Sequence, residues 1–160
     1  LPTCAKAMRQ FTGTLRRFQI LGQTHQITVV DDYAHHPSEI KATLQAAQEW
    51  FPTSRIVAIF QPHTHSRTKA LFTDFAQSFT PADEVIFLPI YASAREAIDP
   101  NIDSLKLTQE TGKYHPHASY QETRGSLLQY LKDSTLAGDV ILTIGAGDIF
   151  SLGKHLLDNL

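Results

Sequence analysis

The chain has 160 residues, of which 42% are hydrophobic and 19% charged, a composition that fits one globular domain and excludes an intrinsically disordered chain. Its formal net charge of −2 gives no general attraction to nucleic acid or to an anionic membrane. The single cysteine, Cys4, allows no internal disulfide and no cysteine-based zinc site, and no apolar run approaches the ~20 residues of a membrane span. We therefore expect a cytoplasmic protein that binds neither nucleic acid nor membrane.

Residues 1–12 begin without methionine and have no core pattern, so we expect them to be a truncated linker from an upstream domain, followed by one domain over 13–160. Two short strands are predicted between Arg16 and Val30, with a turn at Gly22–Thr24. Further strands are predicted at 56–60, 85–88, 115–118 and 140–144, and helices at 37–51, 71–79, 104–111, 125–131 and 150–157. This alternation predicts a Rossmann-like α/β fold, in which a mostly parallel sheet has helices on both faces and a short N-terminal hairpin.

Polar and charged side chains are concentrated in the segments that directly follow the predicted strands. Four segments have this character: 31–37, 61–67, 91–96 and 145–148. The carboxyl ends of parallel strands form one edge of a sheet, and ligands bind at that edge in open α/β folds. We therefore expect these four segments to converge on one site.

The chemistry of these segments favours an anionic small molecule as the ligand. They contain fixed cations and several imidazoles, namely Arg67, Arg95, His35, His36, His63 and His65. A guanidinium matches planar carboxylate and phosphate groups, and a histidine can donate, accept or hold a proton. The acidic pair Asp31 and Asp32 could also cap a turn or helix, the histidines could bind a metal, and Arg95 with Glu96 could be an exposed ion pair of little energetic value.

Two glycine-containing segments resemble phosphate-binding motifs without matching them. Gly145-Ala146-Gly147 is similar to a dinucleotide fingerprint, but Phe150 stands in place of the third glycine. The segment from Gly147 to Lys154 is similar to a Walker A loop, but His155 stands where serine or threonine is required. An ATP-dependent enzyme containing this chain would need its phosphate loop elsewhere.

Four ordered motifs identify a resemblance that covers nearly the whole chain. They are 11–18 (FTGTLRRF), 31–37 (DDYAHHP), 60–68 (FQPHTHSRT) and 145–149 (GAGDI). In these motifs the chain resembles the C-terminal domain of the Mur ligases. The Phe-Gln-Pro-His segment points within that family to the ligase that adds L-alanine.

The resemblance implies an activity that needs more than this domain. In the family one domain holds the UDP-sugar, a second carries the ATP phosphate loop, and the third closes over ATP with the incoming amino acid. It implies ATP and Mg²⁺ as cofactors, with Mg²⁺ held mainly by the central domain, and L-alanine and UDP-N-acetylmuramate as substrates. An acyl phosphate forms on the substrate carboxylate, and the amine of L-alanine attacks it in the synthesis of peptidoglycan precursors. The isolated domain is expected to be inactive.

The resemblance also assigns roles to individual residues. Arg17 corresponds to the arginine that faces the ATP phosphates, and Asp32 to the acid that contacts the nucleotide at its ribose. Four residues correspond to the lining of the alanine pocket: Tyr33, His35, His63 and Arg67. Arg67 is expected to pair with the alanine carboxylate. Thr64 stands where some members carry arginine, which leaves Arg67 as the main carboxylate ligand, and His65 stands where an aromatic residue is common and receives no role.

Three alternatives remain open from the sequence. A sister ligase that attaches a cell-wall tripeptide to UDP-N-acetylmuramate shares the loop at 31–37, although the segment at 61–63 argues against it. A stand-alone nucleotide- or anion-binding module would have no upstream domains. A metal hydrolase would use the histidine pairs, although no HExxH pattern is present.

Overall fold

The computed structural model describes residues 14–93, 96 and 98–160, so the expected linker at 1–12 lies outside the described residues. Six strands form one sheet in the order β1-β2-β6-β3-β4-β5. Their bounds are β1 Gln19–Thr24, β2 Ile27–Asp32, β3 Ile56–Phe60, β4 Glu84–Phe87, β5 Ala118–Tyr120 and β6 Val140–Ile144. Only β1 pairs antiparallel, and the other pairings are parallel, which confirms the predicted mixed, mostly parallel sheet with an N-terminal hairpin.

The turn of that hairpin lies further along the chain than the sequence predicted. It is formed by His25 and Gln26, which both adopt positive φ angles of 46° and 64°. A two-residue turn of this kind matches the right-handed twist of the two strands that it joins. Gly22 lies instead inside β1, where the register with β2 shifts between Ile20 and Gly22. The prediction of a turn at Gly22–Thr24 was therefore wrong, because glycine marks a bulge here.

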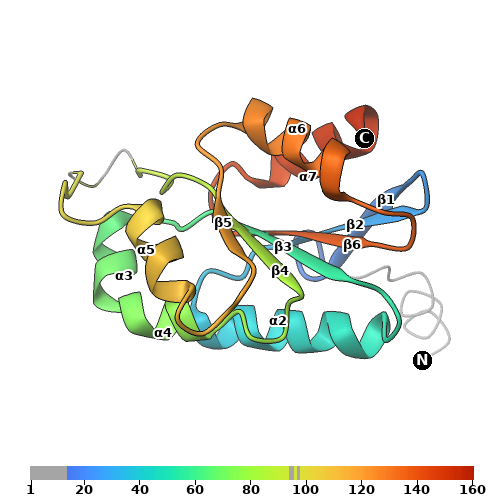
Figure 1. Cartoon of the computed structure of the whole chain (residues 1–160). Helices are drawn as coiled ribbons and strands as arrows, with labels where there is room; N and C mark the ends of the chain where they lie inside the picture. The colour runs from blue at the N-terminus through green and yellow to red at the C-terminus, as the bar shows by residue number, and fades with distance from the viewer. Residues whose placement is uncertain (1–13, 94–95, 97) are drawn as a thin grey trace, which may run out of the picture.

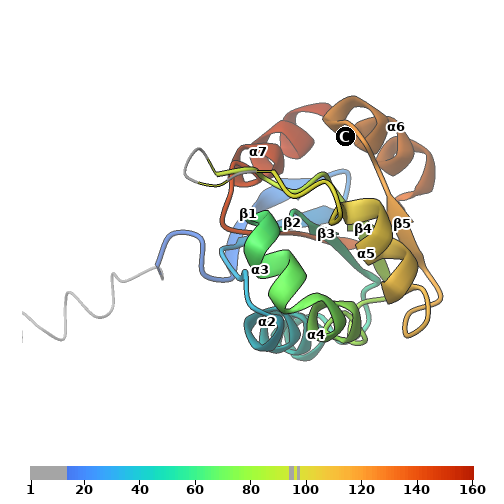
Figure 2. The ribbon, with the colours of Figure 1, turned by 90° about the vertical axis from the view of Figure 1, so that its left-hand side faces the viewer.

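Helices cover both faces of the sheet, as predicted (Figure 1). Their bounds are α2 Pro37–Trp50, α3 His65–Ala70, α4 Phe72–Gln77, α5 Ser104–Thr111, α6 Arg124–Ser134 and α7 Phe150–Asn159. The view turned by 90° shows α2 and α4 on one side of the sheet and α6 and α7 on the other (Figure 2). Alternate residues of β3 enter the two cores, since Phe60 packs with α2 and α4 whereas Ile59 packs with α6 and α7.

Two further predictions of elements needed correction. The helix expected at 71–79 corresponds to the shorter α4, and a separate helix that was not predicted, α3, precedes it from His65 and ends before Leu71. Phe79 lies beyond the end of α4, yet its side chain is fully buried, so its place in the apolar pattern reflects packing rather than a continuous helix. The strand expected at 115–118 lies at Ala118–Tyr120, because His115 is buried and its Nε2 lies 2.9 Å from the carbonyl oxygen of Ala82.

Candidate functional site

The carboxyl ends of β2, β6, β3 and β4 lie along one edge of the sheet, and hydrogen bonds join the loops that follow them. The amide of Gly145 donates to the carbonyl of Asp32 (3.1 Å), and that of Gln61 donates to Ile144 (3.1 Å). His63 and Tyr91 form an isolated parallel bridge, which joins the segment after β3 to the segment after β4. The predicted convergence of the four segments is therefore confirmed for their described residues.

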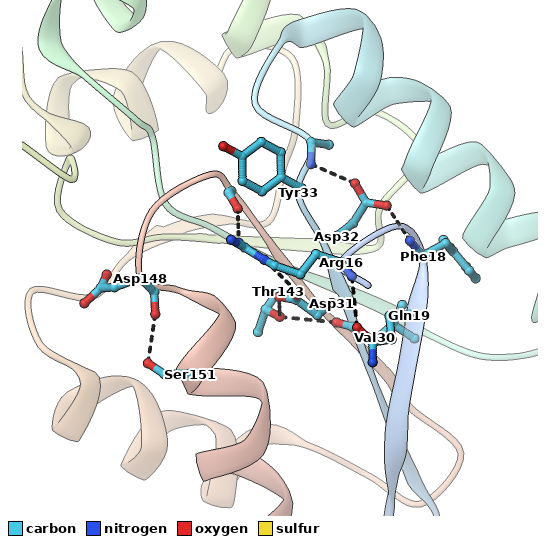
Figure 3. Close-up of polar contacts among 12 residues, drawn as sticks. Arg16, Phe18, Gln19, Val30, Asp31, Asp32, Tyr33, Thr143, Asp148 and Ser151 are labelled. Atoms are coloured by element: carbon cyan, nitrogen blue, oxygen red, sulfur yellow. Dashed lines mark hydrogen bonds and ion pairs between the residues drawn. The ribbon is translucent and has the colours of Figure 1, made fainter. Parts of the chain in front are cut away.

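The side chain of Arg16 contacts several segments at this edge (Figure 3). Its Nε donates to Oδ2 of Asp31 (3.2 Å), and its Nη2 donates to the carbonyl of Gly145 (2.7 Å). The guanidinium carbon lies 4.7 Å from the ring centroid of Tyr33 and 5.0 Å from that of Phe150. The guanidinium of Arg16 therefore links the segment before β1 to the loop after β2 and to the loop after β6.

The adjacent acids Asp31 and Asp32 are both buried, and both accept hydrogen bonds from other residues of the chain. Asp31 accepts a hydrogen bond from the hydroxyl of Thr143 (2.7 Å) in addition to the one from arginine. The two oxygens of Asp32 accept separately, from the backbone N–H of Phe18 (2.7 Å) and from that of Ala34 (2.7 Å). Asp32, which the resemblance assigns to the nucleotide, thus also holds the backbone just before β1 and just after β2.

Tyr33 and His35 follow directly and form a small ring cluster with Arg17. The ring of Tyr33 lies edge-on to His35, with centroids 5.2 Å apart, and the exposed guanidinium of Arg17 lies 5.6 Å from the Tyr33 centroid. Arg17 forms no ion pair with a described residue. Burial opposes ionisation of Glu39, but the N–H groups of His35 and His36 hold its pKa below the usual value. Glu39 thereby completes the capping box that starts α2.

His63 and Arg67 provide polar atoms that are buried and unsatisfied. Nδ1 of His63 and Nη1 of Arg67 have no hydrogen-bond partner among the described residues. The imidazole of His63 stacks on the ring of Tyr91, with centroids 5.5 Å apart and planes at 13°. Burial lowers the pKa of His63, the charges of Arg67 and His35 lower it further, and Glu96 opposes them. The pKa of His63 thus lies below its ordinary value, and the fixed cation Arg67, with its unsatisfied buried Nη1, contributes to that shift.

The start of α3 is held by a carboxylate from a distant loop. Oε2 and Oε1 of Glu96 accept from the backbone N–H groups of His65 (2.6 Å) and Ser66 (2.7 Å). A hydrogen bond from the side chain of Ser66 is the main cause that holds the pKa of Glu96 below its usual value, and the two backbone bonds lower it further. Thr64, the residue before the helix, adopts a φ of 74°, a left-handed conformation that is strained for a β-branched side chain. Arg95, the expected ion-pair partner of Glu96, lies outside the described residues.

Arg16 and Tyr91 are the site residues to which sequence reasoning gave no role. Arg16 belongs to a recognised motif, but nothing in the adjacent pair Arg16-Arg17 shows which side chain turns inward. The available signal was Asp31, because a buried carboxylate requires a compensating cation nearby. Tyr91 is only the first residue of the polar segment 91–96. Its stacking on His63 depends on a bridge between two segments that are distant in sequence.

Two hollows lie on the described part of the chain, and one of them borders this cluster of side chains at Tyr91. One of about 260 Å³ lies at the same edge, between Gln61, Tyr91 and Arg124. The other, of about 770 Å³, lies at the opposite edge beside Arg55, whose guanidinium is already paired with Asp139 at 2.7 Å. Within the described ranges no group of three or more metal-ligating side chains is close enough to hold an ion, and no helix is long and apolar enough to cross a membrane.

Comparison with known proteins identifies relatives over nearly the whole chain. The family model described as "Mur ligase, glutamate ligase domain" matches residues 16–147. UDP-N-acetylmuramate–L-alanine ligase of Caldanaerobacter subterraneus subsp. tengcongensis is 49% identical over 151 residues, which cover 94% of this chain and 32% of the relative. The corresponding ligase of Desulforapulum autotrophicum is 47% identical over 156 residues, covering 96% of this chain and 34% of the relative. The chain thus spans about a third of the length of these curated relatives.

Solved structures show the same architecture. The crystal structure of UDP-N-acetylmuramate–alanine ligase from Thermotoga maritima superposes with a TM-score of 0.76 at 31% identity, covering 96% of this chain and 31% of that one. A murein peptide ligase from Psychrobacter arcticus also gives a TM-score of 0.76, at 24% identity, covering 98% of this chain and 32% of that one, and supports the fold alone. The family model and the similarity over most of the chain agree, and the chain belongs to the Mur ligase family, of which it forms the glutamate ligase domain.

Proposed function

We propose that this chain is the C-terminal domain of an ATP-dependent ligase that adds L-alanine to UDP-N-acetylmuramate in peptidoglycan precursor synthesis. The observation that carries the proposal is that two buried polar atoms, Nη1 of Arg67 and Nδ1 of His63, have no hydrogen-bond partner among the described residues. A free amino acid presents a carboxylate and an amine, which a guanidinium and a hydrogen-bond acceptor can bind together. The relatives described above are UDP-N-acetylmuramate–L-alanine ligases, which supports L-alanine and UDP-N-acetylmuramate as the substrates.

Four residues are assigned to the proposed L-alanine pocket. Arg67 binds the alanine carboxylate, and the free Nδ1 of His63 accepts a hydrogen bond from the amine. Tyr33 and His35, whose rings pack edge to face, are assigned to the lining of the same pocket. In the proposed reaction the amine nitrogen attacks the acyl phosphate and inorganic phosphate leaves, so this domain orients the nucleophile.

ATP is proposed to lie where this edge meets the central domain of the ligase. Arg17 fits the role of phosphate ligand, because its guanidinium is exposed at the same edge and forms no ion pair with a described residue. Asp32 can contact the ribose only with the lone pairs left by its two backbone hydrogen bonds. Mg²⁺ would neutralise phosphate charge when bound, and we assign its protein ligands to the central domain. The proposed enzyme works in the cytoplasm.

The substrate assignment can be tested with the full-length ligase. We expect UDP-N-acetylmuramate-dependent ADP formation with L-alanine and none with the tripeptide that the sister ligase would use. The 160-residue chain alone should give no ADP above a blank with either substrate, because it contains no phosphate loop. Turnover by the chain alone would contradict the proposal, and preferential use of the tripeptide would favour the sister ligase. A full-length protein without upstream domains would support a stand-alone anion-binding module.

The nucleotide assignment predicts a selective kinetic defect. In the full-length ligase, Arg17→Ala and Asp32→Asn should each raise the KM for ATP by roughly tenfold, the cost of one charge-assisted hydrogen bond, with little change in the KM for UDP-N-acetylmuramate. Because Asp32 also holds two backbone amides, its variant should in addition lower the melting temperature, whereas Arg17→Ala should not. An unchanged KM for ATP in Arg17→Ala would remove that residue from the nucleotide site.

A further inference from the structure

We propose that Tyr91 is a positioning residue of the amino-acid pocket, because its ring holds the imidazole of His63 in the orientation that L-alanine requires. This inference rests on the proposed function for its substrate. Its structural part concerns only how Tyr91 and His63 are placed, and can be measured separately.

The backbone and the ring of Tyr91 both engage the segment around His63. The N–H of Tyr91 donates to the carbonyl of Pro62 (2.8 Å), and its carbonyl accepts from the N–H of Thr64 (3.1 Å). The two hydrogen bonds thus bind the residues on either side of His63. The rings lie nearly parallel at 5.5 Å, within the range of offset stacking. Tyr91 therefore fixes both the main chain and the ring plane of His63.

The glycine loop after β6 provides the space that the ring of Tyr91 needs. A Cβ atom added to Gly147 would lie 2.7 Å from Cγ of Tyr91 and 2.9 Å from Oε1 of Gln61. Both distances are shorter than real contacts, so any side chain at this position would displace the tyrosine or the glutamine. The absence of a side chain at Gly147 is thus a condition for the stack on His63.

The ring of Tyr91 covers the imidazole of His63 and so affects its protonation, together with the charged groups around it. Arg67 places positive charge near His63, protonation of His35 would add to it, and Glu96 places negative charge near it. Burial and the charge of Arg67 keep the pKa of His63 below its ordinary value. A protonated His63 would lose the free acceptor for the amine and would set a second cation beside the alanine ammonium. Removing the ring of Tyr91 hydrates the imidazole and thereby favours this protonated state.

The structural part is tested by following the titration of the eight histidines of the 160-residue chain by NMR. We expect Tyr91→Ala to raise the pKa of His63 toward its ordinary value of about 6.5, and Tyr91→Phe to leave it unchanged because the ring is kept. Tyr114→Ala is the matched control, since Tyr114 is 44% exposed against 37% for Tyr91. The inference is overturned if His63 titrates in Tyr91→Ala as in the parent, or if Tyr91→Phe shifts it equally.

The same variants in the full-length ligase test the link to the substrate. Loss of one aromatic stack should raise the KM for L-alanine roughly two- to tenfold and shift the acid limb of the alanine kcat/KM profile to higher pH, with the KM for ATP unchanged. Tyr91→Phe should restore both values. If the pKa of His63 rises but alanine kinetics do not respond, the placement of Tyr91 stands and the assigned amino-acid pocket is wrong. If an Arg67 variant impairs alanine use but Tyr91→Ala does not, the pocket stands and the positioning role of Tyr91 is wrong.

Discussion

Replacing Arg16 by glutamine is expected to destabilise the domain by about 2–3 kcal/mol, the largest stability effect that we predict for a single side chain at the site. The change removes the cation that compensates Asp31, whose carboxylate is only 2% exposed, and it also removes the donor to the carbonyl of Gly145. We place the effect just below the roughly 3–5 kcal/mol that breaking a fully buried ion pair costs, because the side chain of Arg16 is itself 24% exposed. Thermal melting should show a decrease of roughly 5–10 °C.

The neighbouring arginine provides the matched control. Arg17→Gln removes the same charge one residue away, but Arg17 is exposed and forms no ion pair with a described residue, so its melting temperature should change by about 1–2 °C at most. Combining Arg16→Gln with Asp31→Asn should recover part of the lost stability, since no uncompensated carboxylate then remains buried. Equal melting temperatures for the two single arginine variants would show that the Arg16 network adds nothing to stability.

Replacing Arg67 by lysine is expected to raise the KM for L-alanine in the full-length ligase by about ten- to a hundredfold, with kcat nearly unchanged. Lysine keeps the charge but loses the planar pair of donors that matches a carboxylate. The buried Nη1 of Arg67 has no partner among the described residues, so the bond to substrate replaces no existing protein contact. A loss of about 1.5–3 kcal/mol from one charge-assisted hydrogen bond accounts for the size of the effect.

Lys69 offers a control on the same helix. Its side chain is 60% exposed and pairs with Asp99 at 2.8 Å, so Lys69→Arg retains the charge at an exposed position two residues away and should leave alanine kinetics unchanged. If Arg67 only solvates the first turn of α3, then Arg67→Lys will also leave the KM for alanine within about twofold of the parent, and the proposed carboxylate contact is wrong.

The elements with simple physical signals were predictable from the sequence. The strands at 56–60 and 140–144 coincide with β3 and β6, because continuous apolar runs indicate strands that are covered on both faces. The helix expected from Pro37 begins there, where proline suits the first turn and His36 supplies the cap. The hairpin turn was predicted wrongly, and the separate helix α3 was not predicted. Both depend on tertiary contacts, which the spacing of apolar residues does not reveal.

The sequence was enough to predict where the site lies, but it was not enough to predict which side chains contact each other there. The rule that ligands bind at the carboxyl ends of parallel strands is enough to place the four polar segments together from the sequence alone. The sequence could not show that Asp32 is committed to two backbone amides, or that Arg16 and not Arg17 turns inward. Both facts depend on the left-handed backbone of Arg16 (φ 59°) and Phe18 (φ 43°), which neither residue type favours in isolation.

The position of β6 within the sheet has a consequence for how the chain is made. This strand is the last to be synthesised, yet it lies between β2 and β3 and pairs with both. During translation the ribosome releases β1 to β5 first, and β2 and β3 then expose the backbone edges that β6 will cover. The central sheet can close only after residue 144 has emerged. A nascent chain stalled before that point should stay protease-sensitive and should bind chaperones that recognise open strand edges.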